Sequence, residues 1–277
     1  MEYFDLTGVL TMASISVAAG VLGGILAGLL GVGGGIVIVP ALYIALTQVA
    51  GIGAGLAMQI AVATSLLTIV FTSLSSSWGH YKRGVIDIEL LKLWAPAILI
   101  GVILGSLLGS YVSGYVLIAI FAIVAAVVSI EMIARKAKET NEPRNFAKPV
   151  WAALGVFAGT VSAMMGIGGG TVCVPILNFL GYDIRRAVGS SAAIGFIIGF
   201  PSAIIYALSG LGQEGLPPFS LGYVNLLAAG IIIPMSTSFA RVGVKIAHSI
   251  PRNRLRNVFG IFLAVTSVRM LADLLGT

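Results

Sequence analysis

Residues Gly31 to Pro40 read GVGGGIVIVP, and residues Gly166 to Pro175 repeat the pattern as GIGGGTVCVP. Each copy places three consecutive glycines five residues before a proline, inside a long apolar stretch. A break in the backbone of an apolar segment, at matching positions in the two halves of a chain, is typical of the binding site of a transporter. The repeated pattern therefore indicates a membrane-embedded, duplicated fold.

The composition indicates an integral membrane protein. Hydrophobic residues make up 58% of the chain, charged residues only 9%, and the mean hydropathy is +1.07. A soluble domain carries about 25% charged residues, so this chain cannot cover its surface against water. The apolar runs are continuous and do not alternate, which favours membrane helices over the strands of a barrel. We expect an all-α, polytopic helical membrane protein.

The apolar segments form two sets of five. The first set covers roughly 9–30, 36–50, 55–79, 90–110 and 115–134, and the second covers roughly 150–165, 171–180, 187–209, 221–240 and 256–275. At about 1.5 Å per residue, segment 171–180 is too short to cross a bilayer, and segment 36–50 is marginal. Both follow a Gly cluster directly, so we expect Gly-broken half-helices. The predicted organisation is a membrane repeat over 1–134, a cytoplasmic linker over 135–149 and a second membrane repeat over 150–277.

The two halves also match outside the Gly-rich stretches. Residues 61–65 read AVATS and residues 187–191 read AVGSS. Residues 84–87 read GVID and residues 222–225 read GYVN. Similarity at several ordered positions indicates an internal duplication. Because each copy has an odd number of segments, the second repeat should be inverted in the membrane relative to the first.

The basic residues support this inverted topology. If the N-terminus is outside, 15 of the 16 Lys and Arg residues fall on the inner side, and only Arg269 does not. This asymmetry fits the positive-inside rule with both termini outside. The net charge of +6 is then a topology signal and does not indicate nucleic-acid binding. The inner residues are Lys82, Arg83, Lys92, the five between Arg135 and Lys148, Arg185, Arg186, Arg241, Lys245, Arg252, Arg254 and Arg256.

The Gly clusters are the first candidates for chemistry. A run of glycines leaves backbone N–H groups bare, and successive N–H groups can form a nest that binds an anion. A helix that starts directly after each cluster would add the positive end of its dipole. The alternative is that the glycines are corners where helices pack closely. A nucleotide-binding loop is not indicated, because no Lys-Ser/Thr pair follows either cluster.

The second candidates are the hydroxyl pairs at 64–65 and 190–191, which offer donors without charge. The alternative is that these hydroxyls only bond their own or neighbouring helices. We interpret the polar run 73–78 and His80 as an interfacial zone or vestibule. Glu131 and Arg269 are interpreted as charges near the ends of their segments, whose side chains extend to the membrane surface. The predicted substrate-binding residues are Gly33, Gly34, Gly35, Thr64, Ser65, Gly168, Gly169, Gly170, Thr171, Ser190 and Ser191.

No order of Ser, His and Asp, no carboxylate pair and no metal-ligand spacing stands out in the sequence. We therefore expect no enzyme activity, no catalytic residue, no metal and no cofactor. The single cysteine, Cys173, cannot form an internal disulfide.

Together, these motifs resemble the TauE/SafE sulfite exporter family, also called the toluene sulfonate uptake permease family. The resemblance covers nearly the whole chain and rests on the doubled Gly-x-Gly-Gly-Gly with its following proline, on AVATS, and on His80 with the basic pair before GVID. The second half departs from the pattern with Leu221 before Gly222 and with two serines in place of Thr-Ser.

The resemblance implies a secondary transporter that moves a small sulfur-containing anion, such as sulfite, a sulfonate or sulfoacetate, across the prokaryotic cytoplasmic membrane by alternating access. The expected partners are this anion and the lipid bilayer, with no nucleic acid. A homodimer is one arrangement left open, since the sequence does not define the number of subunits. The alternatives are a channel-like passive pore for small anions and a non-transporting membrane scaffold.

Overall fold

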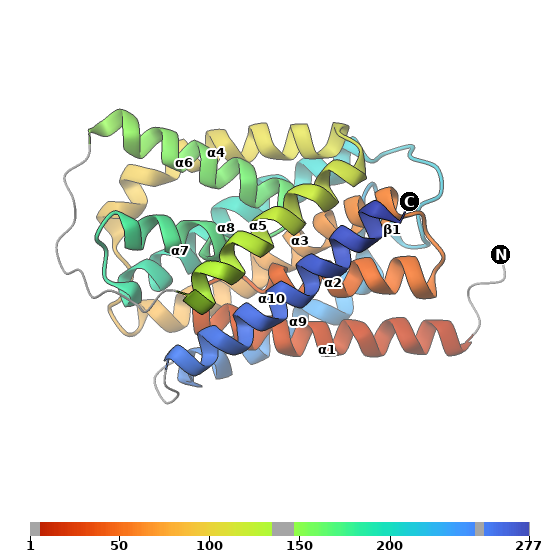
Figure 1. Cartoon of the computed structure of the whole chain (residues 1–277), viewed down its shortest axis with the longest axis horizontal. Helices are drawn as coiled ribbons and strands as arrows, with labels where there is room; N and C mark the ends of the chain where they lie inside the picture. Colours follow the sequence, from red (N-terminus) through yellow and green to blue (C-terminus); the bar gives the residue numbers. More distant parts are fainter. Residues whose placement is uncertain (1–5, 135–146, 247–251, 277) are drawn as a thin grey trace.

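The computed structural model describes residues 6–134, 147–246 and 252–276, and the expected all-α architecture is confirmed (Figure 1). Most of the predicted linker and His248 lie outside the described residues. The elements of the first half are α1 (Leu6–Leu30), α2 (Gly35–Ile44) continuing as the π-helical turn η1 (Ala45–Val49), α3 (Ala54–Tyr81), α4 (Ile88–Tyr111) and α5 (Gly114–Ala134). Those of the second half are α6 (Lys148–Met165), α7 (Gly170–Phe179), α8 (Ile184–Ser209), β1 (Ser220–Leu221), β2 (Val224–Asn225), α9 (Leu226–Ile246) and α10 (Arg252–Leu275).

Six helices among the described residues are long and apolar enough to cross a membrane, namely α1, α3, α4, α5, α8 and α9. Helix α7 has ten residues, about 15 Å of helix and about half of the hydrocarbon core, and α2 with η1 covers Gly35–Val49, which is longer but still shorter than a span of about 20 residues. The segments after the Gly clusters are therefore short helices, as the sequence predicted. The break before α2 occurs where Gly33 and Gly34 adopt positive φ angles of 73° and 82°.

The core of the molecule is built around α3. Within its apolar window, 67% of the residues are buried inside the protein, against 28% for α1. Helix α3 packs against α8, α9, α2 and α5, while α1 packs along α9, α4 along α6, and α5 along α10. The Gly turns and the hydroxyl pairs lie on or beside these central helices.

The helices run roughly along the long axis of the molecule, so the connections between them gather at its two ends (Figure 1). The β1–β2 hairpin and the end of α10 lie at one end, and the α3–α4 and α7–α8 connections lie at the other. These two connections bring basic residues from both halves to a common end: Lys82, Arg83, Arg185 and Arg186.

The polar run of α3 is not the interfacial zone that the sequence suggested. Ser73, Ser75 and Ser76 are buried, and Ser75 Oγ donates to the carbonyl of Thr237 in α9 at 2.8 Å. Likewise, Ser76 Oγ donates to a carbonyl of α1 at 3.1 Å. His80 is also buried, with its Nε2 3.2 Å from the carbonyl oxygen of Gly28. The prediction was wrong for these buried residues, which lie on faces of α3 that contact other helices, whereas Trp78 in the same run is 56% exposed and agrees with it.

Candidate functional site: two touching Gly turns

The first Gly turn (Gly31–Gly35) and the second Gly turn (Gly166–Gly170) lie in direct contact. A Cβ atom placed on Gly33 would lie 3.1 Å from the Cα of Gly168, and one placed on Gly168 would lie 2.9 Å from the Cα of Gly33. Side chains at Gly35 and Gly170 would meet the carbonyl oxygens of the opposite turn. The two clusters are therefore in contact although they are 135 positions apart in the sequence, and close backbone packing explains why several of these positions lack a side chain.

The packing of the turns leaves backbone donors without acceptors. The carbonyl of Gly34 accepts from the N–H groups of Val37 and Ile38, and the carbonyl of Gly169 accepts from Cys173 at 2.7 Å. Among the described residues, no backbone carbonyl accepts from the N–H groups immediately before the two short helices: those of Gly33, Gly34, Gly168 and Gly169. Groups of this kind at a helix start carry partial positive charge and can bind an anion.

Two of the predicted hydroxyls accept hydrogen bonds from the opposite half of the chain. Thr64 Oγ1 in α3 accepts from the backbone N–H of Asn225 at 2.9 Å. Ser190 Oγ in α8 accepts from the backbone N–H of Asp87 at 3.0 Å. A hydroxyl that accepts one bond still has its own hydrogen to donate. Both side chains can therefore hold a helix end and still offer a donor.

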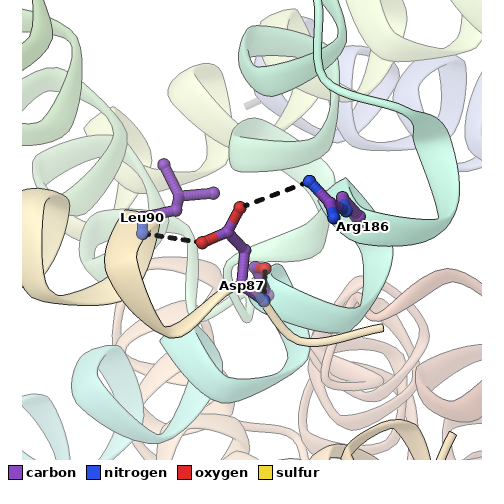
Figure 2. Close-up of polar contacts among 4 residues, drawn as sticks. Asp87, Leu90 and Arg186 are labelled. Carbon is purple, nitrogen blue, oxygen red and sulfur yellow. Dashed lines mark hydrogen bonds and ion pairs between the residues drawn. The ribbon is translucent and has the colours of Figure 1, made fainter. Parts of the chain in front are cut away.

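The residues bonded to these hydroxyls are the N-caps of α4 and α9. Asp87 Oδ1 accepts from the N–H of Leu90 at 3.0 Å, as Figure 2 shows, and Asn225 Oδ1 accepts from the N–H of Ala228 at 2.9 Å. A capping side chain satisfies a donor that the helix itself leaves free. The two capping residues are the final positions of the matching stretches GVID and GYVN.

One cap is charged and the other is neutral. The Arg186 guanidinium lies 3.9 Å from Asp87 Oδ2 (Figure 2), and its side chain is 64% exposed. Asn225, in contrast, donates from its side-chain amide to the carbonyl of Pro218 at 3.1 Å. Burial raises the pKa of Tyr182 in the α7–α8 connection, and the nearby Asp87 carboxylate raises it further. The tyrosine therefore remains a neutral hydroxyl beside this cap.

The remaining predicted hydroxyls surround the second Gly turn. Ser65 Oγ donates to the carbonyl oxygen of Gly166 at 2.7 Å. Thr171 and Ser191 are 3% and 0% exposed, and neither hydroxyl has a hydrogen-bond partner within the described part of the chain. The predicted site residues thus lie on the two turns, in the first turn of α7 and on the adjoining stretches of α3 and α8.

With this geometry in view, the chain was compared with known proteins. Residues 16–270 match the protein family described as Sulfite exporter TauE/SafE. The chain belongs to this family. The resemblance seen in the sequence motifs is therefore confirmed, and the chain is a multi-pass membrane protein of a transporter family rather than an enzyme.

Bacterial and archaeal proteins of similar length, each named as a probable membrane transporter, are similar to this chain. A "Probable membrane transporter protein" of Haemophilus influenzae is 31% identical over 94% of this chain and 98% of its own length. The "Probable membrane transporter protein MJ0441" of Methanocaldococcus jannaschii is 30% identical over 95% of this chain and 96% of its own length. "Probable membrane transporter protein YunE" of Bacillus subtilis is 27% identical over 94% of this chain and 97% of its own length. No solved structure matches the chain.

In this TauE/SafE member the structure adds site residues that sequence reasoning missed. Ser162, in the last turn of α6, is fully buried, and its hydroxyl has no partner in the residues described. A lone serine in an apolar helix carries no signal that distinguishes it from a packing residue. In the sequence, Asp87 and Asn225 stand out only as matching positions of the two halves. Their capping role could have been inferred, because Asp and Asn are preferred at the residue just before a helix begins.

Proposed function

We propose that the protein is a secondary transporter that moves a small sulfur-containing anion, such as sulfite, a sulfonate or sulfoacetate, across the cytoplasmic membrane by alternating access. The family description supports an exported or imported sulfur oxyanion as the substrate class. The proposal includes two inverted membrane repeats over 1–134 and 150–277, with both termini outside and the linker inside.

The observation that carries this proposal is the exchange symmetry of the helix contacts. If α1–α5 correspond in order to α6–α10, the contact of α1 with α9 corresponds to that of α6 with α4, and both exist. The same exchange relates α3–α9 to α8–α4 and α2–α3 to α7–α8, while α3–α8 and α5–α10 map onto themselves. A pattern of this kind is expected of two repeats related by a pseudo-two-fold axis.

The hydrogen bonds follow the same exchange. Thr64 corresponds to Ser190, and Asn225 corresponds to Asp87, so the bond between Asn225 and Thr64 has its counterpart in the bond between Asp87 and Ser190. Each bond attaches the start of α9 or α4 to a central helix of the other half. Opening one attachment while the other stays closed is a way to expose the Gly turns to one side at a time.

The chemistry around the turns supports an anion as the substrate. The donors there are backbone N–H groups and hydroxyls, without a lysine or arginine among the predicted site residues. Uncharged donors bind an anion less strongly than an ion pair in a dry interior, which favours release after each cycle. All of the site residues predicted from sequence are kept in this proposal: Gly33, Gly34, Gly35, Thr64, Ser65, Gly168, Gly169, Gly170, Thr171, Ser190 and Ser191.

The test is flux into proteoliposomes, screened over sulfite, sulfate, thiosulfate, sulfoacetate and taurine. We expect saturable uptake of at least one of these anions, with a rate that responds to a proton or ion gradient. Conductance that neither saturates nor responds to a gradient would favour the channel-like pore. Empty vesicles and vesicles with heat-inactivated protein provide the background.

A further inference from the structure

We propose that the substrate anion is held chiefly at the second Gly turn, by the hydroxyls of Ser162, Thr171 and Ser191 together with the free N–H groups of that turn. This inference rests on the proposed transport function and specifies where in the pseudo-symmetric scaffold the anion sits. Ser162 is a new member of the site.

Three buried hydroxyls without partners border the second Gly turn. Ser162 lies in the last turn of α6, and its carbonyl accepts from the N–H of Ile167 at 3.1 Å. Thr171 lies in the first turn of α7. Ser191 lies beside the turn, because a Cβ on Gly169 would approach its carbonyl oxygen to 3.0 Å. Thus α6, α7 and α8 each contribute one hydroxyl, with exposures of 0%, 3% and 0%.

These hydroxyls are not explained by packing. Glycine is required at Gly168 and Gly170, because a Cβ there would meet the backbone of the opposite turn. The three hydroxyls are not required for packing in this way, because alanine in place of serine, or valine in place of threonine, would fill a similar volume. A buried polar group without a partner costs free energy, and the large majority of buried side-chain polar atoms in proteins have one. Of the six buried hydroxyls without a partner among the described residues, three border this turn. Three around one turn therefore point to a ligand that accepts hydrogen bonds.

The first Gly turn lacks the same hydroxyls. Gly166 follows Gly31 by 166 − 31 = 135 positions, so Ser162 corresponds to Ala27 and Thr171 to Ile36. Ser191 corresponds to Ser65, whose hydroxyl is already used to donate to Gly166. The scaffold is repeated, but its chemistry differs at these positions, and each difference adds free donors to the second turn.

The geometry also fits an anion at the start of α7. Side chains of a helix tilt toward its N-terminus, so the Thr171 hydroxyl lies toward the end of α7 that carries partial positive charge. The N–H groups of Gly168 and Gly169 precede this end and donate to no described carbonyl. Three hydroxyls and backbone N–H groups match an acceptor with several oxygens, as in sulfite or the head group of a sulfonate.

The test compares hydroxyl-deleting variants with a matched control. Thr171→Val and Ser162→Ala each remove a free hydroxyl, and we expect the KM for flux to rise about 10- to 100-fold with little change in kcat. Thr171→Ser keeps a hydroxyl at this position, so its KM should lie much closer to the wild-type value than that of Thr171→Val. The control is Thr160→Val, which removes a hydroxyl of α6 that donates to the carbonyl of Gly101 at 3.0 Å. Its KM should stay at the wild-type value.

Binding is measured separately, as the shift in thermal unfolding of the purified protein on adding sulfite. If wild-type protein transports but Thr171→Val and Ser162→Ala keep the wild-type KM, the inference is wrong and the transport function stands. If wild-type protein moves none of the sulfur anions, the proposed function fails, and the thermal shift is repeated with phosphate, nitrate and acetate. A stabilisation that disappears in Thr171→Val and Ser162→Ala then upholds the anion site; no stabilisation by any anion overturns it.

Discussion

Replacing the next-to-last residue of each turn by alanine should have unequal effects, although Gly34 and Gly169 occupy equivalent places in the sequence. Gly34 has φ +82°, and a Cβ there would lie 2.7 Å from the carbonyl oxygen of Gly23. Gly169 has φ −53° and ψ −30°, which any residue adopts, and its nearest neighbour would be Cγ2 of Ile194 at 2.8 Å. The Gly34 substitution combines a left-handed backbone with a backbone contact, whereas the Gly169 substitution has an ordinary backbone and crowds the β-branched Ile194 and the carbonyl of Ser191.

The energies follow from these contacts. For Gly34→Ala, a left-handed backbone costs about 1–2 kcal/mol, and the displacement of α1 adds about 1–3 kcal/mol, so the loss of stability is about 2–5 kcal/mol. For Gly169→Ala, the reduced freedom of the unfolded chain contributes about 0.5–1 kcal/mol of stability. Crowding against Ile194 and the carbonyl of Ser191 costs about 1–3 kcal/mol, so the net loss of stability should be about 0–2.5 kcal/mol, less than that of Gly34→Ala.

The assay is reversible unfolding of the purified variants in mixed micelles with increasing SDS. Gly34→Ala should unfold at a clearly lower SDS fraction than wild type, and Gly169→Ala at a fraction between the two. Gly169→Ala is then the variant that reports on function: we expect folded protein with strongly reduced flux, because the methyl group stands beside Ser191 at the anion site. Equal destabilisation by both substitutions would refute the reasoning from backbone geometry.

Other predictions concern the supports of the site and the topology. Ser65→Ala leaves the buried carbonyl of Gly166 without its donor, so unfolding should show a loss of about 1–3 kcal/mol, with flux per folded molecule retained better than in the variants of free hydroxyls. Asp87→Asn keeps an oxygen for the cap and removes only an exposed ion pair, so stability should change by about 0–1 kcal/mol, whereas Asp87→Ala should cost about 1 kcal/mol more through the lost cap. In intact cells, an impermeant thiol reagent should label Gln213→Cys but not Thr140→Cys; the reverse pattern would show that the membrane orientation is wrong.

The sequence predicted the elements of this fold well because their signals are local. Apolar length gave the long helices, and the doubled Gly cluster gave the two short ones. The contact between the clusters was also predictable, since a duplication places equivalent breaks around a common axis. The packing explanation for these glycines was already an alternative, and the structure shows that it operates at Gly35 and Gly170, where the opposite backbone leaves no space for a Cβ.

The hydroxyl contacts could not be predicted because their partners are distant in the chain. The bond between Thr64 and Asn225 spans 161 positions, and that between Asp87 and Ser190 spans 103. Ser75 shows a related limit: the sequence placed it in a polar run, but its direction on α3, toward the carbonyl of Thr237, depends on which helix packs there. Composition alone cannot distinguish a serine that faces headgroups from one that faces another helix.

The two hydroxyl pairs connect the anion site to the parts of the fold that would have to move. On α3, Thr64 holds the start of α9, and the next residue, Ser65, holds the second Gly turn. On α8, Ser190 holds the start of α4, and the next residue, Ser191, borders the same turn with its hydroxyl free. Adjacent residues of a helix point about 100° apart, so a small rotation of α3 or α8 changes the cap contact and the Gly-turn contact together. An anion that engages Ser191 therefore acts on the helix that also carries the Asp87 attachment. Ser65, the counterpart of Ser191 in the first half, already donates to the carbonyl of Gly166. On our proposal, binding therefore acts on the α8 attachment more directly than on the α3 attachment.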